Sequence, residues 1–358
     1  NSQPPTSMND RNSETLPPDQ LAIRAKCFHP SGIFIEFKKE EVEDSIPDRF
    51  ERIVRKHPDR LAVKAGDYML TYDELNKIAN RLAHAIVAQQ GTRAEPVGLL
   101  FDQGAPLVAA MLGVLKAGKF FVLLDPSFPK AKITSVLEDS QAELMVFSRQ
   151  KSSLAKGVTG SGCRLMELES VDCGIHVEDL RVSISPRALA VLFFTSGSTG
   201  KPKGVIQNHR NILHDIMLRT NAYHICEQDR LTLLTSVTTS AVNNMFLALL
   251  NGAALYPFDT QQEGASRLVS WLSQEPVSIC WISSALFRNL ESTLTGKESF
   301  PDLRLIRLAS EAVYKGDVDL YKKYFSPNCL LANGIAPTET GLLTTYRIDH
   351  ETEIVGSE

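Results

Sequence analysis

Short apolar segments alternate with helical patterns along most of the chain, and this alternation constrains the fold more than any other feature. Between residues 97 and 147, three apolar segments are separated by two segments with helical spacing. A strand, a helix and a second strand in this order favour right-handed crossovers and a mostly parallel sheet. A second series follows, with predicted strands at 189–194, 231–237, 254–257, 277–282, 303–308 and 329–333 and helices at 211–219, 243–250, 265–272 and 284–294.

We therefore predict an α/β fold with two packed subdomains, residues 21–187 and 188–358, and mostly parallel sheets. Residues 61–63 and 69–72 flank a Gly-Asp turn and are predicted to form a hairpin. Residues 151–187 form a weakly patterned connector. Residues 1–20 are rich in Ser, Asn, Pro and Asp, which predicts a disordered linker. A ligand site is expected at the carboxyl ends of the strands.

Composition excludes several classes of function. The 358 residues are 43% hydrophobic and carry a net charge of −4 without a basic block, so no nucleic-acid partner is predicted. Six cysteines lack metal or disulfide spacing and indicate reduced thiols in the cytoplasm. No apolar run has the length of a membrane helix, and the start has no signal-peptide pattern. The chain stops without an obvious terminating element, so we expect a piece of a larger protein.

One loop carries the clearest chemical signal. The string TSGSTGKPKG begins at Thr195, directly after an apolar segment. Glycine backbone and small hydroxyls can surround an anion closely, and two lysines add positive charge. The glycine spacing differs from a Walker P-loop, and Pro202 stands where that motif has Ser or Thr. A flexible surface loop is the alternative interpretation. The predicted phosphate-binding residues are Thr195, Ser196, Gly197, Ser198, Thr199, Gly200 and Lys201.

This string resembles the phosphate loop of the adenylate-forming superfamily, which includes acyl-CoA synthetases, luciferases and adenylation domains of non-ribosomal peptide synthetases. The resemblance implies that a carboxylate is joined to AMP, that pyrophosphate is released, and that the acyl group then passes to a thiol. Residues 70–86 and 112–129 resemble two further segments of peptide-synthetase adenylation domains and favour that branch. ATP and Mg²⁺ are then the expected cofactors.

A second signature, NGIAPTE, begins at Asn333 and resembles the family's N-x-Y-G-P-T-E segment. By position, Thr338 would contact the α-phosphate and Glu339 would hold Mg²⁺, a cation that prefers carboxylate oxygen. Asn333, Gly334 and Ile335 would contact the nucleotide. Ile335 replaces the tyrosine that usually lies against adenine, and Ala336 replaces glycine, so we expect weaker nucleotide affinity. A helix N-terminus is the alternative interpretation of Pro-Thr-Glu.

Residues 238–246 align with the family's F-D-x-S-V-W-E-M-F segment, whose aspartate pairs with the α-ammonium of an amino acid. Thr239 stands at that position. A buried ammonium without a counter-charge is costly, so we expect an acid without an α-ammonium: an α-hydroxy, α-keto, aryl or short aliphatic acid. The alternative is that another acidic residue supplies the counter-charge, or that the alignment is shifted by one residue. The remaining pocket residues carried over by position are Ser240, Asn243, Trp281, Ile306, Leu308, Gly334, Leu342 and Leu343.

The resemblance covers about residues 45 to 345, the large N-terminal part of the family's fold. The family continues with a small mobile lid that carries a catalytic lysine, and no segment before Glu358 matches it. We therefore expect little activity from this piece alone. The implied partners are a small carboxylic acid, a phosphopantetheinyl carrier protein or CoA, and neighbouring domains of a megasynthase. A free-standing acyl-CoA ligase and a degenerate, non-catalytic scaffold domain are the alternatives.

Overall fold

The structure is a computed structural model of the chain. It describes residues 16–66, 68–160, 162–171, 177–196, 202–234, 239–309, 311–337 and 340–354. Within these residues no helix is both long and apolar enough to cross a membrane.

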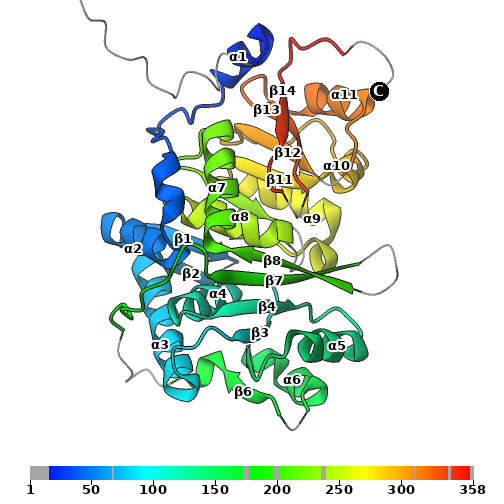
Figure 1. Ribbon diagram of the computed structural model, residues 1–358. Coiled ribbons are helices and arrows are strands. Elements are labelled where there is room, and N and C mark those ends of the chain that lie inside the picture. The colour runs from blue at the N-terminus through cyan, green and yellow to red at the C-terminus, as the bar shows by residue number, and fades with distance from the viewer. Residues whose placement is uncertain are drawn as a thin grey trace, which may run out of the picture.

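Two β-sheets form the framework (Figure 1). In the eight-stranded sheet only the end pairs, β13–β14 and β1–β2, are antiparallel. In the six-stranded sheet only β7–β8 is antiparallel. The predicted α/β fold with mostly parallel sheets is therefore confirmed. In spatial order, the strands of the larger sheet are β14 (Thr344–Ile348), β13 (Leu330–Ile335), β12 (Leu305–Ala309), β11 (Ile279–Ser283), β9 (Arg230–Leu233), β10 (Ala254–Pro257), β1 (Leu61–Ala65) and β2 (Tyr68–Thr71). Those of the smaller sheet are β6 (Arg164–Glu167), β5 (Leu144–Phe147), β3 (Pro96–Leu100), β4 (Phe120–Leu124), β7 (Leu189–Ser196) and β8 (Pro202–Asn208).

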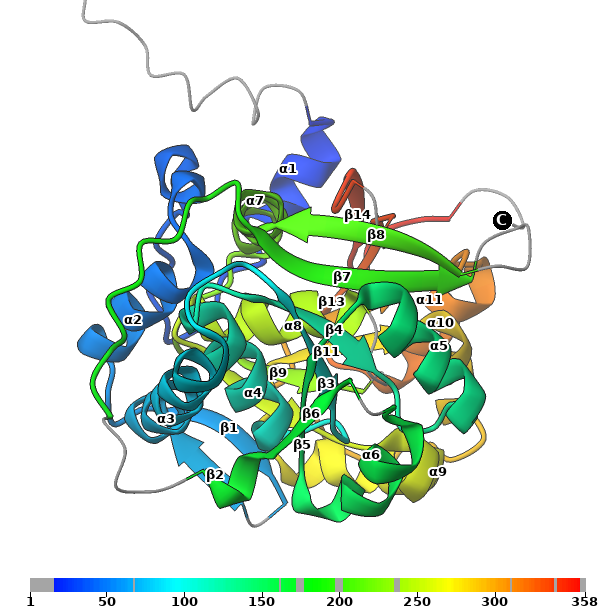
Figure 2. The same ribbon diagram turned by 60° about the horizontal axis from the view of Figure 1, so that its bottom comes forward.

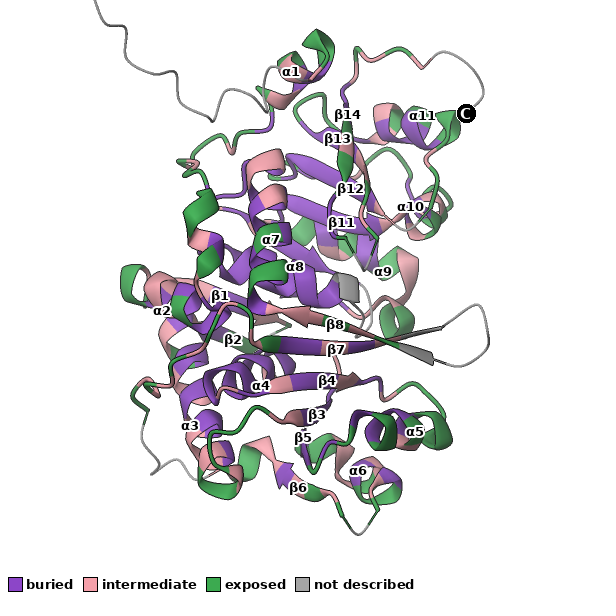
Figure 3. Cartoon of the chain, in the orientation of Figure 1, coloured by how far each residue is buried: buried purple, intermediate pink, exposed green. Residues whose placement is uncertain are grey.

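A layer of helices lies between the two sheets. The helix α4 (Ala105–Lys116) packs against β1 of the larger sheet and against β3 and β4 of the smaller one. Every residue of this helix except Pro106 is buried, as expected for a helix that is apolar on all sides (Figure 3). The helix α8 (Thr239–Leu249) packs against β9 and β10 from the same layer, between the sheets (Figure 2).

The other helices cover the ends and outer faces. Outer helices show one exposed side, whereas α4 does not (Figure 3). Their bounds are α1 (Pro18–Arg24), α2 (Ile46–Lys56), α3 (Tyr72–Gln90), α5 (Lys130–Ser140), α6 (Ser152–Val158), α7 (His209–Tyr223), α9 (Thr260–Gln274), α10 (Ser284–Leu290) and α11 (Lys315–Tyr324), with short 3₁₀ turns at Lys39–Glu43, Arg149–Lys151 and Leu168–Ser170.

Local sequence fixes the ends of α7, the helix that carries several residues of the site described below. Asn208 and Asn211 form a reciprocal cap in which the Asn208 side chain accepts a hydrogen bond from the Asn211 backbone at 2.7 Å. The helix ends at His224, whose φ of 48° places it in the left-handed region. Residues 225–229 then connect α7 to β9.

The predicted division of the chain at residues 187 and 188 is wrong. The hairpin β1–β2 belongs to the larger sheet, because Val63 of β1 pairs in parallel with Leu255 of β10. The strands β7 and β8 belong to the smaller sheet, because β7 pairs with β4. Each sheet therefore takes strands from both predicted subdomains. Strand pairing does not follow sequence order, and the spacing of apolar residues along one strand contains no information about its partner.

The predicted disordered segment 1–20 also extends too far. Residues 18–20 begin α1, and Gln20 is buried. Its amide donates to the Arg347 carbonyl at 2.9 Å and accepts from the Arg347 N–H at 2.8 Å. This pair of hydrogen bonds attaches the start of the chain to β14, a strand that the sequence did not indicate. Residues 1–15 lie outside the described residues.

Five other elements were missed. Two of them, α6 and β6, lie in the predicted connector 151–187, and β6 extends the smaller sheet in parallel with β5. The strand β8 was predicted as part of a loop. The helix α11 and the strand β14 were not predicted at all. These elements are short or lack a clear apolar period, so their tertiary contacts decide their conformation.

A buried ion pair joins the starts of three strands of the larger sheet to α7 and to the segment after α1. Arg304, before β12, donates to both carboxylate oxygens of Asp229, before β9, at 2.8 and 2.7 Å. The same guanidinium donates to the carbonyls of Cys27 and Tyr223. Ser278, before β11, donates to Asp229 at 2.7 Å. Burial opposes ionisation of Asp229, but the Arg304 charge and these hydrogen bonds outweigh it and hold the pKa of the carboxyl below its usual value.

Replacing Asp229 by Asn leaves the Arg304 charge buried without its counter-charge. We expect the free energy of unfolding to fall by about 3–5 kcal/mol in urea denaturation at neutral pH. The control is Glu43→Gln, which breaks the half-exposed pair between Glu43 and Arg210, at 2.6 Å, and should cost less than about 1 kcal/mol. Equal losses from both variants would contradict this interpretation.

The same pair predicts a pH dependence. Because the folded pKa of Asp229 is lowered, the unfolded chain binds its proton at a higher pH than the native state does. The contribution of Asp229 is therefore fully present above its unfolded pKa of about 4 and decreases as the pH falls through the folded pKa. Stability measured against pH should decline less steeply below about pH 4 in Asp229→Asn than in the parent protein.

Candidate functional site

The carboxyl ends of three neighbouring parallel strands, β11, β12 and β13, form one side of a cavity of about 590 Å³. Trp281 of β11 lies beside Arg307 of β12, and Arg307 lies beside Ala332 of β13. Its polar lining comes from Arg219, Arg307, Glu311 and Asn333, and its apolar lining from Trp281, Ala309, Ala312, Val313, Ile335, Ala336 and Pro337, with Gly334 between them. The predicted crevice at the strand ends is thus a real cavity.

Trp281 forms an aromatic wall of this cavity. Its side chain is buried, and the ring of Tyr223 meets it edge to face with centroids 5.5 Å apart. Two guanidinium groups lie against the indole, with central carbons 5.6 Å (Arg219) and 5.1 Å (Arg307) from the ring centroid. Cations at this distance are attracted by the negative face of an indole. The ring therefore orients both charges.

Arg307 is a buried cation in a strand that is otherwise apolar. Only 3% of the residue is exposed. Nη2 donates to the Gly334 carbonyl at 2.9 Å, whereas Nε has no hydrogen-bond partner among the described residues. Burial, together with the charge of Arg219, lowers the pKa of Arg307. An arginine remains charged at neutral pH even so.

Asp215 of α7 connects the helical layer to the loop before β14. It accepts hydrogen bonds from Arg219 Nε at 2.7 Å, from Asn243 Nδ2 at 3.0 Å and from the Leu342 N–H at 2.6 Å. Asp215 and Arg219 are both buried and lie one helical turn apart. A single carboxylate thus fixes an arginine of the cavity, a residue of α8 and the chain that follows the second signature.

Two predicted pocket residues, Ile306 and Leu308, lie on the opposite face of the sheet from Trp281. Both pack in a separate apolar cluster with Leu320 and Tyr321 of α11. Side chains alternate along a strand, and the register pairs Trp281 with Arg307, so Arg307 and Ala309 share the face of Trp281. The alignment with the family had therefore assigned the pocket positions on β12 one residue too early. Arg307 and Ala309 replace Ile306 and Leu308 in the pocket.

The other predicted pocket residues have different positions. Gly334 lines the cavity. Asn243 is buried and its side-chain amide is bound to Asp215. Leu342 packs in the central core, whereas Leu343 is 61% exposed, so neither stands among the described residues that line the cavity. Thr239 and Ser240 begin α8, but their side chains lie outside what the structure describes.

The predicted nucleotide-binding residues are described in part. Thr195 and Ser196 are the last residues of β7, and Ser196 pairs with Pro202, the first residue of β8. Residues 197–201, which include Gly197, Ser198, Thr199, Gly200 and Lys201, lie outside the described part of the chain, as do Thr338 and Glu339. In the second signature, Asn333 and Ile335 line the cavity at the end of β13, and Ile335 is 59% exposed.

The structure does not test the metal prediction. Among the described residues no group of three or more His, Cys, Asp or Glu side chains could hold an ion. Glu339, the predicted ligand, is not one of them.

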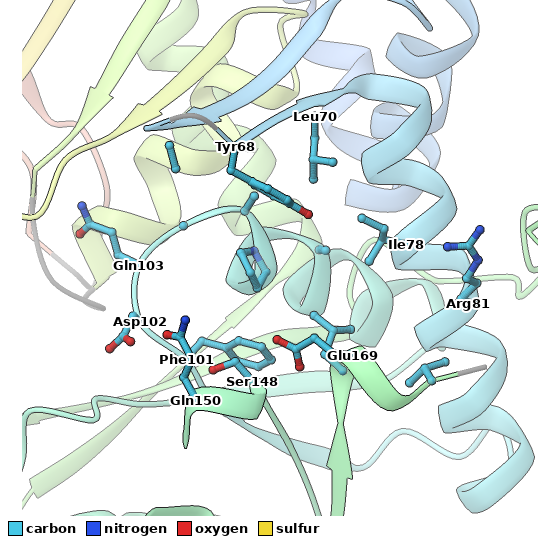
Figure 4. A pocket seen from close by; sticks show the side chains of 17 residues that line it. Tyr68, Leu70, Ile78, Arg81, Phe101, Asp102, Gln103, Ser148, Gln150 and Glu169 are labelled. Carbon is cyan, nitrogen blue, oxygen red and sulfur yellow. The ribbon is translucent and has the colours of Figure 1, made fainter. Parts of the chain in front are cut away.

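A second cavity, of about 530 Å³, lies between the β1–β2 hairpin, α3 and the segment after β3 (Figure 4). The side chains of Tyr68, Phe101 and Glu169 point into it. Among the described residues it shares no lining residue with the cavity at β11–β13. Its lining includes Leu70, Ile78 and Arg81 of the segment 70–86, but none of the predicted nucleotide, metal or substrate residues.

The comparisons with known proteins identify the class. The sequence profile of the family described as AMP-binding enzyme matches residues 50–357, and the chain belongs to this family. The predicted resemblance to adenylate-forming enzymes is confirmed. The chain is 32% identical over 311 residues to gramicidin S synthase 2 of Brevibacillus brevis, an alignment that covers 86% of this chain and 7% of that protein. The chain thus spans less than a tenth of the length of this curated relative.

Two solved structures share the fold. A non-ribosomal peptide synthetase, FmoA3 (S1046A), superimposes with a TM-score of 0.79 at 20% identity over 93% of this chain and 35% of that chain. The Klebsiella oxytoca NpsA N-terminal subdomain, in complex with 3-hydroxybenzoyl-AMSN, superimposes with a TM-score of 0.75 at 22% identity over 87% of this chain and 78% of that chain. At these identities the likeness shows the fold alone.

Sequence reasoning missed Asp215, Arg219 and Arg307, although each left a signal. Arg307 interrupts the apolar run LIRLA, and a charge in the middle of a buried strand demands a partner. Asp215 and Arg219 have the i, i+4 spacing of an ion pair on a helix. What the sequence did not indicate is that the two segments meet at one indole ring.

Gly341 is needed where the chain passes Asp215. Its φ is +71°, and a Cβ there would lie 2.6 Å from an Asp215 carboxylate oxygen. We expect Gly341→Ala to lower the free energy of unfolding by about 1–3 kcal/mol in chemical denaturation, because it adds backbone strain and displaces the carboxylate.

The control for this variant is Gly316→Ala in α11. A Cβ at Gly316 has no atom within 4 Å, and alanine favours the helix, so stability should be unchanged or rise by up to about 1 kcal/mol. A tolerated Gly341→Ala would show that the contact between Asp215 and the Leu342 segment is dispensable.

Proposed function

We propose that this domain activates a carboxylic acid with ATP, forming an acyl-adenylate and releasing pyrophosphate. The observation that carries the proposal is the cavity at the ends of β11, β12 and β13, which Asn333, Gly334 and Ile335 of the second signature line in a chain of the AMP-binding enzyme family. Its volume of about 590 Å³ is in the range of small-molecule sites. A chain of this fold, FmoA3, has been solved in an AMPPNP-bound form.

In the proposed reaction a carboxylate oxygen attacks the α-phosphorus of ATP, and the bond from that phosphorus to the bridging oxygen of pyrophosphate breaks. The loop from Thr195 to Lys201 would hold the phosphates through backbone N–H groups, hydroxyls and a lysine. Thr338 would donate to the α-phosphate, and Glu339 would hold Mg²⁺. When bound there, Mg²⁺ would supply positive charge for the phosphate oxygens.

We further propose that the acid lacks an α-ammonium. Thr239 occupies the position at which the family's aspartate pairs with that group. The structure adds support, because the described acids near the cavity are already paired: Asp215 with Arg219 at 2.7 Å and Glu311 with Arg288 at 3.3 Å. An ammonium entering this cavity would meet guanidinium groups rather than a free carboxylate.

The acceptor of the acyl group is proposed to be the phosphopantetheine thiol of a carrier protein. The similarity to a large synthase, of which this chain spans 7%, supports neighbouring megasynthase domains as partners. The five described cysteines are free thiols, which agrees with the cytoplasmic location that we propose. An acyl-CoA ligase fits residues 70–86 and 112–129 less well.

A non-catalytic scaffold domain is the second candidate. Ile335 and Ala336 favour it, because Ile335 stands where the family has a tyrosine and is 59% exposed at the edge of the cavity. An aliphatic side chain can still pack against a purine but offers no aromatic stacking. The candidate requires that nucleotide does not turn over at all.

Exchange of labelled pyrophosphate into ATP tests the proposal. The protein in its full natural length should catalyse exchange that depends on a carboxylic acid, from a panel of hydroxy, keto, aryl, aliphatic and amino acids. Glu339→Gln should lower the rate by about a hundredfold or more, because the metal loses its carboxylate ligand. Silence with every acid, with nucleotide binding unaffected by Glu339→Gln, would favour the scaffold.

Thr239→Asp tests the substrate class. The parent protein should not activate common α-amino acids, and the variant should gain measurable amino-acid-dependent exchange, because an aspartate supplies the counter-charge for an ammonium. Thr239→Asn, which has the same shape without the charge, should not gain this activity. Ready activation of amino acids by the parent protein would contradict the proposed substrate class.

A further inference from the structure

Arg307 places a positive charge inside the cavity that the proposed function assigns to the acid. Its neighbours along β12, Ile306 and Leu308, face the opposite side of the sheet, so the guanidinium alone projects from this part of the strand toward Trp281. Because the residue is almost fully buried, water cannot solvate the charge as it would at the surface. A buried charge of this kind needs a partner.

The described residues do not balance this charge. Asp215 is the buried carboxylate nearby, and it is paired with Arg219 at 2.7 Å. Two buried guanidinium groups therefore share one buried carboxylate, which leaves a net positive charge. Glu311 also lines the cavity, but its side chain is 47% exposed and is paired with Arg288 at 3.3 Å. Solvent screening makes it a weak partner for a group inside the cavity.

Arg307 also has donor capacity to spare. A guanidinium carries five N–H groups. Among the described residues, Arg307 donates from Nη2 to the Gly334 carbonyl, and Nε has no hydrogen-bond partner. A buried donor without an acceptor costs free energy of folding that a bound acceptor would recover. This unpaired donor therefore points to a ligand oxygen.

The surroundings hold the guanidinium in place and keep space beside it. The Trp281 ring lies against it, and the Gly334 carbonyl accepts one of its hydrogen bonds. Gly334 has no side chain, and a Cβ at that position would lie 3.0 Å from Arg307 Nη2. A planar, fixed guanidinium suits a planar carboxylate, which it can bind through two parallel hydrogen bonds.

We infer that the acid activated by this domain carries a second, non-reacting carboxylate, which binds Arg307 in the cavity beside Trp281. The substrate class is thus a dicarboxylic acid of small or medium size. The inference rests on the proposed function, because it names the substrate of that site. It also explains why position 239 has a threonine and no acidic side chain: a positively charged cavity selects an anion rather than an ammonium.

Matched substrate pairs test the inference. Acid-dependent pyrophosphate exchange is measured with the full-length protein for succinate against succinamate and for isophthalate against isophthalamate. In each pair the second carboxylate becomes a neutral amide of nearly the same shape. The parent protein should prefer the diacid in kcat/KM by about ten- to a hundredfold in at least one pair.

Arg307→Gln should abolish this preference by lowering kcat/KM for the diacid while the monoamide changes little. Arg210→Gln is the control, because Arg210 forms a half-exposed surface pair with Glu43 and should leave the preference unchanged. If Arg307→Gln does not fold, the preference of the parent protein decides alone.

The outcomes separate the two proposals. Exchange that is equal for both members of every pair, or a monoamide that is preferred, overturns the inference and leaves the adenylation function standing. An equal loss for both members in Arg307→Gln also overturns it, since Arg307 would then serve the reacting carboxylate or the nucleotide. If no acid of the wider panel supports pyrophosphate exchange, the proposed function itself is wrong.

Discussion

Two mostly parallel sheets share one layer of helices, and the cohesion of the framework depends on this sharing. α4 touches β1 on one side and β3 and β4 on the other, and it can do so because nearly all of its residues are apolar and buried. Parallel strands need cover on both faces, and a helix that is apolar on all sides provides it for two sheets at once. The sheets are thereby held together, with the strand ends of the larger one open at the cavity.

Two buried arginines inside this apolar framework, Arg304 and Arg307, differ in how far their hydrogen bonds are completed. No buried polar atom of the Asp229 or Arg304 side chain lacks a hydrogen-bond partner. The pair connects the segment after α1, α7 and the starts of three strands. Arg307 differs, since one of its buried nitrogens lacks an acceptor among the described residues. Arg347 also has buried nitrogens without a partner, so it is the position of Arg307 in the cavity, together with its unpaired nitrogen, that suggests a ligand.

The sequence predicted the elements better than their assembly. The bounds of β10 were predicted without error, because a short apolar run between a glycine and a proline leaves few alternatives. The partition of strands between sheets was wrong, because Val63 pairs with Leu255 across a separation that no local pattern encodes. Of the predicted pocket residues, Trp281 and Gly334 line the cavity. Ile306 and Leu308 do not, because shifting an alignment by one residue moves a strand side chain to the other face.

That one-residue shift changes the chemistry of the pocket. With Ile306 and Leu308 in the lining, the cavity would be apolar and would select by size. With Arg307 and Ala309 there, it is charged, and a small side chain beside the charge leaves room for a ligand. Size discriminates weakly between acids, whereas a buried guanidinium left unpaired by the wrong substrate discriminates strongly. In the proposed substrate class, Thr239 stands where the family has an aspartate, and Arg307 adds a positive charge to the cavity. Both features would favour a carboxylate over an ammonium.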